Sequence, residues 1–336
     1  MKNRVALVFP YYGKYPNYFS LWLRTAEYNP QIDFLFFTDK MPDYKYSANI
    51  KYIEMSFNEL KNLIASKFPD IDIVLDKPYK ICDYRPAFGL IFEEYLRGYD
   101  FWGHCDPDII WGRFDHFISD KMLDDYERIY TRGHLSLYKN NEKLNTIFMR
   151  DHGFKDCYYY KYVFTTPFGC NFNEWGTKYG YAISTICNRL GVKTYDEIDF
   201  ADIAYNKYAF HSAIGEPFDA IAFESTAEGL FGYKLDNGNL LKKEYLYLHL
   251  QKRDMVIEND LLEQEVGDFV IIPNSFKKRE YSLKMEDYIY SIPKRIFYPE
   301  WYKKRIKRFF NKIKQGAIQQ LLYRKLCILG VIKYRG

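Results

Sequence analysis

Short apolar runs, each ended by a turn residue or a charge, recur in the first third of the chain and constrain its fold most. Residues 4–9 contain the first run, which stops at a proline-tyrosine-tyrosine-glycine sequence. Residues 34–38 form a second run ended by Asp39, residues 50–55 alternate like a third strand, and residues 99–105 form a fourth. Continuous apolar runs of this length are typical of strands that are buried on both faces of a parallel sheet.

Helical periodicity fills the intervals between these runs. Apolar residues recur at helical spacing in residues 17–28. Ser56, followed three residues later by a glutamate, forms a capping-box pattern that predicts the start of a second helix. Residues 80–96 predict a third helix, beginning close to Tyr84 because Pro86 is tolerated only near a helix start. This alternation predicts an α/β fold with a mixed, mostly parallel sheet flanked by helices.

The chain of 336 residues contains no repeat and no low-complexity linker, so one continuous domain is expected over residues 1–293. We interpret residues 1–135 as its nucleotide-binding half. Residues 136–293 are less periodic and rich in aromatic residues and glycine. We interpret them as the half that shapes an acceptor pocket.

Residues 294–336 form a separate basic tail. They carry 13 lysines and arginines and one acid, so their net charge is +12. Because the whole chain has a net charge of +4, residues 1–293 have a net charge of −8. In residues 301–332, apolar residues from Ile306 to Leu322 recur at spacings of three and four, which predicts a basic amphipathic helix. Such a helix binds anionic membrane surfaces. The alternative is a helix packed on the domain with its lysines in water.

The cysteines and the apolar segments bear on the compartment. Six dispersed cysteines without a CxxC pair favour a reducing environment. The apolar run near the N-terminus has five residues, too few for the core of a secretion signal. No segment approaches the roughly 20 apolar residues that span a bilayer. We therefore expect a cytoplasmic protein, peripheral on the cytosolic face of the inner membrane.

The sequence Asp106-Pro107-Asp108 directly follows the fourth apolar run. Pro107 restrains Asp106 to extended geometry, in which residues i and i+2 point to the same side. The two carboxylates then face one point at the carboxyl end of a strand, where open α/β sheets bind ligands. Such oxygens suit Mn²⁺ or Mg²⁺, which can neutralise a departing phosphate. The alternative is a capping or loop role for both acids.

His249 lies at the end of another apolar run, residues 246–250, and polar residues follow it. A histidine at this place can complete a metal site, and Lys252 can touch a phosphate. The alternative is a core histidine with its hydrogen bonds satisfied inside the protein.

Further candidates precede the acidic motif. Lys80 and Arg85 can grip a diphosphate, and Asp83 can accept a hydrogen bond from a ribose or a base. The alternative is an ordinary solvated helix start. Contacts with a nucleoside are expected from residues that follow the first two strands: Tyr11, Tyr12 and Asp39.

Together these motifs resemble the GT-A glycosyltransferases. Three segments are also similar to a bacterial family from capsule and surface-polysaccharide loci: residues 80–89, 101–112 and 247–253. The resemblance implies that Asp106 and Asp108 hold Mn²⁺ and the diphosphate of a sugar nucleotide. It also implies that His249 is the third protein ligand, as in the retaining glycogenin-like branch. That branch follows its histidine with a glycine and Lys-Pro-Trp, which this chain lacks, so a retaining or inverting outcome stays open.

The function that this resemblance implies is transfer of a sugar from a UDP- or GDP-sugar to a surface-polysaccharide or lipid-linked glycan acceptor. An inverting enzyme needs a base, and the candidate acids are Glu174, Asp199 and Asp202. The alternative is that all three are structural or solvated acids. His134 can contact the donor or the acceptor, and the alternative is a loop residue without function. The alternative function is a non-catalytic sugar-nucleotide or glycan binder on a degenerate transferase scaffold. The acidic body and the lack of a recognised module argue against a nucleic-acid partner.

Overall fold

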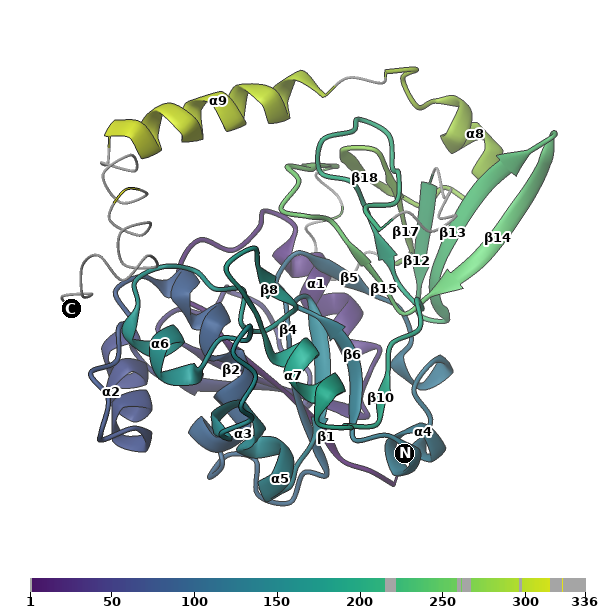
Figure 1. Cartoon of the computed structure of the whole chain (residues 1–336). Helices are drawn as coiled ribbons and strands as arrows, with labels where there is room; N and C mark the ends of the chain where they lie inside the picture. Colours follow the sequence, from purple (N-terminus) through teal and green to yellow (C-terminus); the bar gives the residue numbers. More distant parts are fainter. Residues whose placement is uncertain are drawn as a thin grey trace.

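A seven-stranded sheet forms the centre of the protein (Figure 1), in the order β10-β6-β7-β4-β1-β2-β3. The computed structural model describes residues 2–214, 222–258, 261, 267–295, 298–314 and 322. Strands β3, β2, β1 and β4 run parallel, β7 is antiparallel to both neighbours, and β6 and β10 are parallel. The bounds are β1 (Val5–Pro10), β2 (Ile32–Thr38), β3 (Ile50–Glu54), β4 (Phe101–Cys105), β6 (Arg128–Arg132), β7 (Leu135–Lys139) and β10 (Thr194–Tyr195).

The central strands are buried on both faces, as their apolar runs predict. Successive side chains of a strand point to opposite faces. Ala6 and Val8 of β1 therefore enter one core, whereas Val5, Leu7 and Phe9 enter the other. Burying both faces in this way makes β1 and its neighbours a rigid platform for the loops at their ends.

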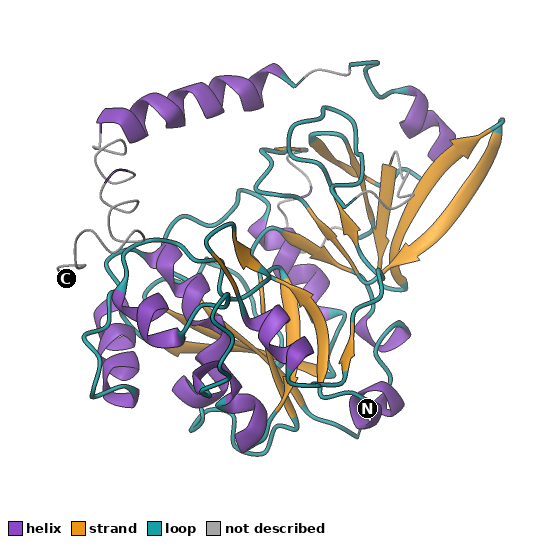
Figure 2. Cartoon of the chain, viewed as in Figure 1, coloured by secondary structure: helices purple, strands orange, loops and turns teal. Residues whose placement is uncertain are grey.

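Helices cover both faces of the sheet (Figure 2). On one face lie α1 (Phe19–Glu27) and α4 (Asp120–Asp125). On the other lie α2 (Phe57–Lys67), α3 (Phe88–Ile91), α5 (Glu142–Asn145), α6 (Tyr160–Thr165) and α7 (Ile183–Arg189). The predicted capping box is confirmed: Glu59 N donates to Ser56 Oγ at 3.2 Å, and Ser56 N donates to the Glu59 carboxylate at 2.7 Å. Such a cap contributes about 1 kcal/mol to helix stability.

The helix predicted over residues 80–96 differs in the structure. A 3₁₀ segment, η1 (Pro78–Ala87), comes first, and α3 adds a single α-helical turn. Pro86 lies inside η1, where it has no N–H to donate and its ring opposes an α-helical ladder. Further 3₁₀ turns are η2 (Phe114–His116) and η3 (Ile147–Met149).

Two smaller sheets were not foreseen in full. A three-stranded sheet contains β11 (Ala201–Asp202), β15 (Tyr247–His249) and β5 (Ile109–Trp111), and only β15 was predicted as a strand. A six-stranded, mainly antiparallel sheet contains β12 (Ala222–Thr226), β13 (Gly229–Asp236), β14 (Asn239–Tyr245), β16 (Val256–Ile257), β17 (Phe269–Ile272) and β18 (Ser275–Lys278). A short hairpin pairs β8 (Gly176–Thr177) with β9 (Gly180–Tyr181). The protein is thus a mixed α/β fold with a mostly parallel central sheet flanked by helices.

The tail begins with α9 (Pro299–Lys314), which follows α8 (Met285–Tyr290) and crosses the top of the view in Figure 1. The predicted helix is confirmed over this length, and its continuation to residue 332 lies outside the described residues apart from Leu322. Among the residues that the structure describes, no helix combines the length and apolar character needed to cross a bilayer.

Candidate functional site

Two paired strands bring Asp108 and His249 together. Asp106 directly follows β4, and Asp108 directly precedes β5. Strand β5 pairs antiparallel with β15, so Ile109 lies opposite His249. The Leu250 amide donates to the Asp108 carbonyl at 2.8 Å and extends this ladder. The polar side chains therefore meet at the carboxyl end of β4.

The Asp106–Asp108–His249 cluster has the geometry of a cation site. Each residue offers one ligand atom, and these atoms lie within 4.8 Å of one another. His249 Nε2 lies 3.6 Å from Asp108 Oδ2. Asp108 is fully buried, and its Oδ1 has no hydrogen-bond partner among the described residues. A buried, unsatisfied carboxylate oxygen is costly, and a divalent ion would satisfy it. Two carboxylates and one imidazole are a ligand set that can hold a divalent cation.

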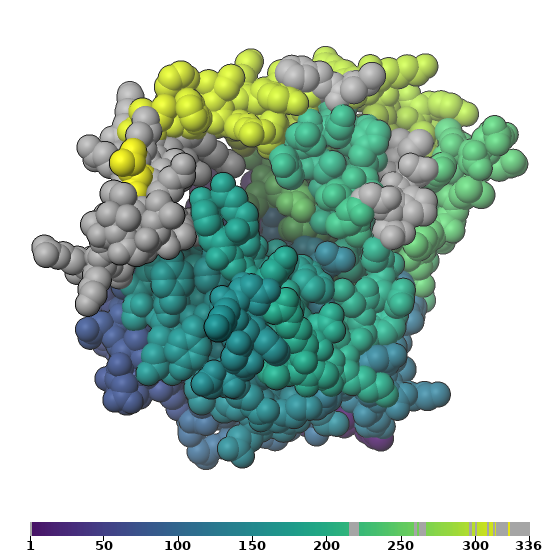
Figure 3. All heavy atoms as spheres, in the orientation of Figure 1, coloured from purple at the N-terminus to yellow at the C-terminus, as the bar shows by residue number. Residues whose placement is uncertain are grey.

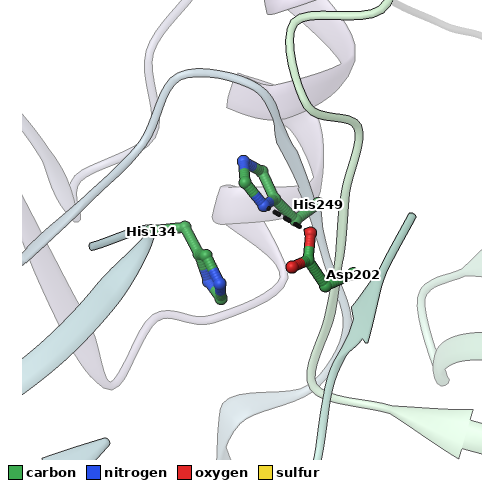
Figure 4. Close-up of side chains that lie close together, drawn as sticks. All are labelled: His134, Asp202 and His249. Carbon is green, nitrogen blue, oxygen red and sulfur yellow. Dashed lines mark hydrogen bonds and ion pairs between the residues drawn. The ribbon is translucent and has the colours of Figure 1, made fainter. Parts of the chain in front are cut away.

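Asp202 orients the imidazole of His249 (Figure 4). Strands β11 and β15 are parallel with Asp202 opposite His249, and Asp202 Oδ1 lies 2.8 Å from His249 Nδ1. Gln251 Nε2 donates to the same oxygen at 2.7 Å. A carboxylate on the far nitrogen of a metal-binding histidine sets the tautomer and the direction of the ring. This contact is that of a positioning residue, and the role of Asp202 as a base stays a prediction.

Opposing forces set the charge of His249. Burial lowers the pKa of this imidazole, but the carboxylates of Asp108 and Asp202 outweigh it and raise the pKa to about 10. Without a cation, His249 is therefore an imidazolium that partly neutralises the two acids.

His134 lies against His249 and completes the wall of the cluster. Its ring centroid is 4.4 Å from that of His249, and its Nδ1 is 2.7 Å from the Tyr247 hydroxyl. Burial, followed by the neighbouring His249, holds the pKa of His134 well below its usual range. His134, Asp202 and His249 also offer ligand atoms within 4.8 Å. This second group shares His249 with the first, so the two describe one site.

Arg85 holds Asp106 in place. Its guanidinium donates to Asp106 Oδ1 at 2.6 Å and to the Gly133 carbonyl at 2.6 Å. Burial acts to raise the pKa of Asp106, but Arg85, together with His249 and Lys252, brings it below its ordinary value. Asp106 is therefore kept ionised as a ligand for a cation.

A cavity of about 620 Å³ opens beside this cluster; we call it the first cavity. Aromatic rings from the loop after β1 and from η1 line much of it, with Arg85, Asp106 and Lys252 at one end. Tyr12 and Tyr18 also line it, but their hydroxyls are buried inside the protein and have no hydrogen-bond partner among the described residues. An aromatic cavity of this volume with a few charged groups in its wall is typical of a site for a nucleotide-sized ligand.

A strained turn directs Lys252 to the first cavity. Gln251 and Lys252 both have left-handed backbone, with φ of 52° and 55°. The Lys252 amide donates to Asp108 Oδ2 at 2.6 Å, which helps to hold the turn. The Lys252 ammonium lies 4.7 Å from the centre of the Tyr79 ring. Asp108 thus fixes both the cluster and the cation beside it.

Glu174 lies close to the cluster. A Cβ on Gly133 would collide with the Glu174 carboxylate, so Glu174 packs against the residue whose carbonyl binds Arg85. Burial raises the pKa of Glu174, and the charge of Asp106 raises it further against the opposing effects of Arg85, His249 and Arg132. The structure therefore brings this candidate base within the electrostatic field of the site.

Other predicted residues have different partners. The buried Lys80 ammonium donates to Asp83 at 2.8 Å and to the carbonyls of Val163 and Phe168 at 2.9 and 2.8 Å. Asp83 also accepts from the amides of Cys170 and Phe172, both at 3.0 Å. This pair therefore anchors the segment of residues 163–172, and these contacts engage the groups that were predicted to bind a diphosphate and a ribose.

Asp39 and Asp199 also lie apart from the cluster. Asp39 is exposed beyond the end of β2. Asp199 accepts hydrogen bonds from the hydroxyls of Tyr130 and Tyr195 at 2.7 and 3.0 Å, which hold its carboxylate in place.

Some residues of the site were missed by sequence reasoning. Tyr18 and Tyr79 line the first cavity, but tyrosines are so frequent in this chain that they carry no individual signal. Nothing in the sequence indicated the contacts that Arg253 makes. Its guanidinium donates to the carbonyls of Ala204, Lys207 and Tyr208 and pins the segment after β11.

A comparison with protein families matches residues 7–280, which include the cluster and the first cavity, to a family of unknown function, DUF6625. A comparison with curated proteins found no match. Because the match covers most of the chain, the protein belongs to the DUF6625 family.

Proposed function

We propose that the protein is a metal-dependent glycosyltransferase of the GT-A type, which binds a UDP- or GDP-sugar through Mn²⁺ or Mg²⁺. The observation that carries this proposal is the convergence of Asp106, Asp108 and His249 beside the first cavity. A parallel sheet that places acids at the carboxyl end of a central strand is consistent with a nucleotide site.

The donor would lie across the first cavity with its diphosphate at the cluster. A bound divalent ion supplies Lewis-acid stabilisation for the nucleoside diphosphate that leaves. Arg85 keeps Asp106 ionised, Asp202 orients His249, and Lys252 adds a positive charge at the same end. The protein's own residues therefore bind and orient the donor before reaction.

The aromatic end of the first cavity suits a nucleoside. Tyr11 and Tyr15 lie with ring centroids 4.5 Å apart, and both line the cavity. Faces of such rings stack on planar groups such as a nucleobase.

Glu174 is our candidate for the base. It would accept the proton of an acceptor hydroxyl as that oxygen bonds to the anomeric carbon and the nucleoside diphosphate departs with the electron pair of the broken bond. Its raised pKa suits this task, because a base works best when its pKa approaches the working pH. The acceptor would be a surface-polysaccharide or lipid-linked glycan.

The tail helix supports a membrane partner. Ile306, Phe309, Phe310 and Ile313 of α9 share one helical face and are between 38% and 60% exposed. Lysines and arginines at positions 303, 304, 305 and 307 surround them. We propose that this face rests on an anionic membrane, because apolar burial and attraction to acidic lipids then act together.

The test of the transferase proposal is Mn²⁺-dependent hydrolysis or transfer with a panel of UDP- and GDP-sugars. Asp108→Ala should abolish turnover, whereas Asp124→Ala, a change at a surface ion pair with Lys2, should leave it intact. Turnover that persists in Asp108→Ala would remove the metal role. Mn²⁺-dependent donor binding without any turnover would favour the alternative of a non-catalytic sugar-nucleotide binder.

A further inference from the structure

A second cavity, of about 360 Å³, lies between α9 and the turn that follows β15. The space-filling view shows the surface hollowed beneath α9 (Figure 3). The transferase chemistry described above leaves this cavity without a role. Its walls nevertheless combine charged and aromatic side chains from segments far apart in the sequence.

Specific contacts hold α9 over this cavity. The Trp301 ring lies 5.3 Å from the Tyr205 ring, which belongs to the segment after β11. Lys304 forms an ion pair with Asp254, which follows the turn after β15. The first turns of the tail helix are therefore part of the wall, so the tail contributes to a site on the main domain.

The second cavity carries an excess of positive charge. Four cations line it, Lys252, Arg253, Lys304 and Arg305, against the single acid Asp254. Lys304 is paired with Asp254, and the Arg253 guanidinium donates to backbone carbonyls. The Lys252 ammonium lies over the Tyr79 ring, so Arg305 is the cation most available to a ligand. The Arg305 guanidinium lies 5.0 Å from the centre of the Trp301 ring. Contact with the face of this ring does not use the N–H groups of Arg305, so they can donate to an anion. Such a wall favours a phosphate or diphosphate group, for which arginine provides a matching fork of donors.

The two cavities are neighbours. Lys252, Arg253 and Asp254 line both of them, and the Lys252 amide is bonded to Asp108. A ligand in the second cavity would therefore lie next to the turn that contacts the cluster that we assign to the donor diphosphate.

We propose that the second cavity binds the phosphate or diphosphate group of an anionic acceptor, with Arg305 of the tail as its principal ligand. The proposal rests on the proposed transferase function and specifies its acceptor. The phosphate can belong to a lipid carrier or to the glycan itself. An acceptor anchored in this way presents its sugar toward the donor at the junction of the two cavities.

The test is calorimetric binding of farnesyl diphosphate and of inorganic diphosphate to the full chain in EDTA, which removes any cation from the Asp106–Asp108–His249 cluster. Arg305→Ala should weaken binding at least tenfold. Lys303→Ala is the matched control, since it removes the same charge from the same helix turn but does not line the cavity. It should change the affinity less than twofold.

The outcomes separate the two sources of phosphate. Tighter binding of farnesyl diphosphate indicates a lipid-linked acceptor, and equal binding of inorganic diphosphate indicates that the phosphate alone is recognised. No binding in EDTA, or equal losses in Arg305→Ala and Lys303→Ala, would overturn the proposal. Mn²⁺-dependent UDP binding reports on the donor site separately: it should survive Arg305→Ala and disappear in Asp108→Ala.

Discussion

His249 Nε2 lies 3.6 Å from Asp108 Oδ2, although the two residues are 141 positions apart in the sequence. This short distance brings the Asp106-Pro107-Asp108 motif and His249 into one polar cluster. It also explains why an imidazolium is favoured there without a cation, because the carboxylate attracts the positive charge.

Metal binding should release a proton from His249. A metal ligand must be a neutral imidazole, whereas its pKa of about 10 keeps His249 charged at neutral pH. Mn²⁺ affinity should therefore increase with pH up to about 10. Calorimetry in buffers of different ionisation enthalpy should show close to one proton released per ion at pH 7. Release of the same number of protons by His249→Gln would contradict this assignment.

The stability of the metal-free protein should depend on the same group. The folded pKa of His249 exceeds its ordinary value of 6.5, so its charged form stabilises the fold fully below pH 6.5. That contribution is lost as the pH rises through about 10. The difference in free energy of unfolding between the wild type and His249→Gln, measured by urea denaturation in EDTA, should narrow over this interval. A constant difference from pH 6 to pH 10 would argue against the charged pair.

Asp202→Asn should weaken Mn²⁺ binding about 10- to 100-fold, because this change disturbs the hydrogen bond that directs His249. The melting temperature of the metal-free protein should change less than in Asp202→Ala, which leaves His249 Nδ1 unpaired. Metal titration followed by electron paramagnetic resonance provides the measurement. Unchanged affinity in Asp202→Asn would mean that the ring is positioned by other contacts.

Lys80→Met should destabilise the fold while sparing the donor site. The change leaves the buried Asp83 carboxylate without its cation, which costs about 3–5 kcal/mol. Urea denaturation should reveal this loss. Under conditions where the variant is folded, its Mn²⁺-dependent UDP affinity should match that of the wild type. A selective loss of UDP affinity with unchanged stability would restore the predicted contact with the diphosphate.

Membrane binding should require α9. Phe310→Glu places a charge on its exposed apolar face, so flotation with liposomes containing phosphatidylserine should fall strongly. The matched control is Leu241→Glu on β14, whose side chain is 49% exposed. Binding by the wild type should also weaken at high salt, because ions screen attraction to acidic lipids. Flotation by a chain truncated at residue 293 would exclude this role of the tail.

Local patterns in the sequence were enough to predict the strands of the parallel part of the central sheet and the cap of α2. The strands β1, β2 and β4 are mostly buried on both faces, so each is a short apolar run, whereas β3 at the sheet edge alternates. The cap of α2 involves residues three apart. The antiparallel sheet from β12 to β18 was not predicted. Its hairpin β13–β14 has one largely exposed strand, and its pairing depends on partners that composition does not identify.

By itself, the sequence determined that Asp106 and Asp108 lie near one point, because a proline and an extended backbone act within three residues. It also determined the basic amphipathic character of α9. Only the tertiary structure decided that His249 joins the acids, that Asp202 orients it, and that Lys80 and Asp83 are structural. The side chain of a lysine or an acidic residue has the same functional group at a structural site and at a ligand-binding site. Their roles depend on which groups the fold buries against them, and strand pairing between distant segments sets those neighbours.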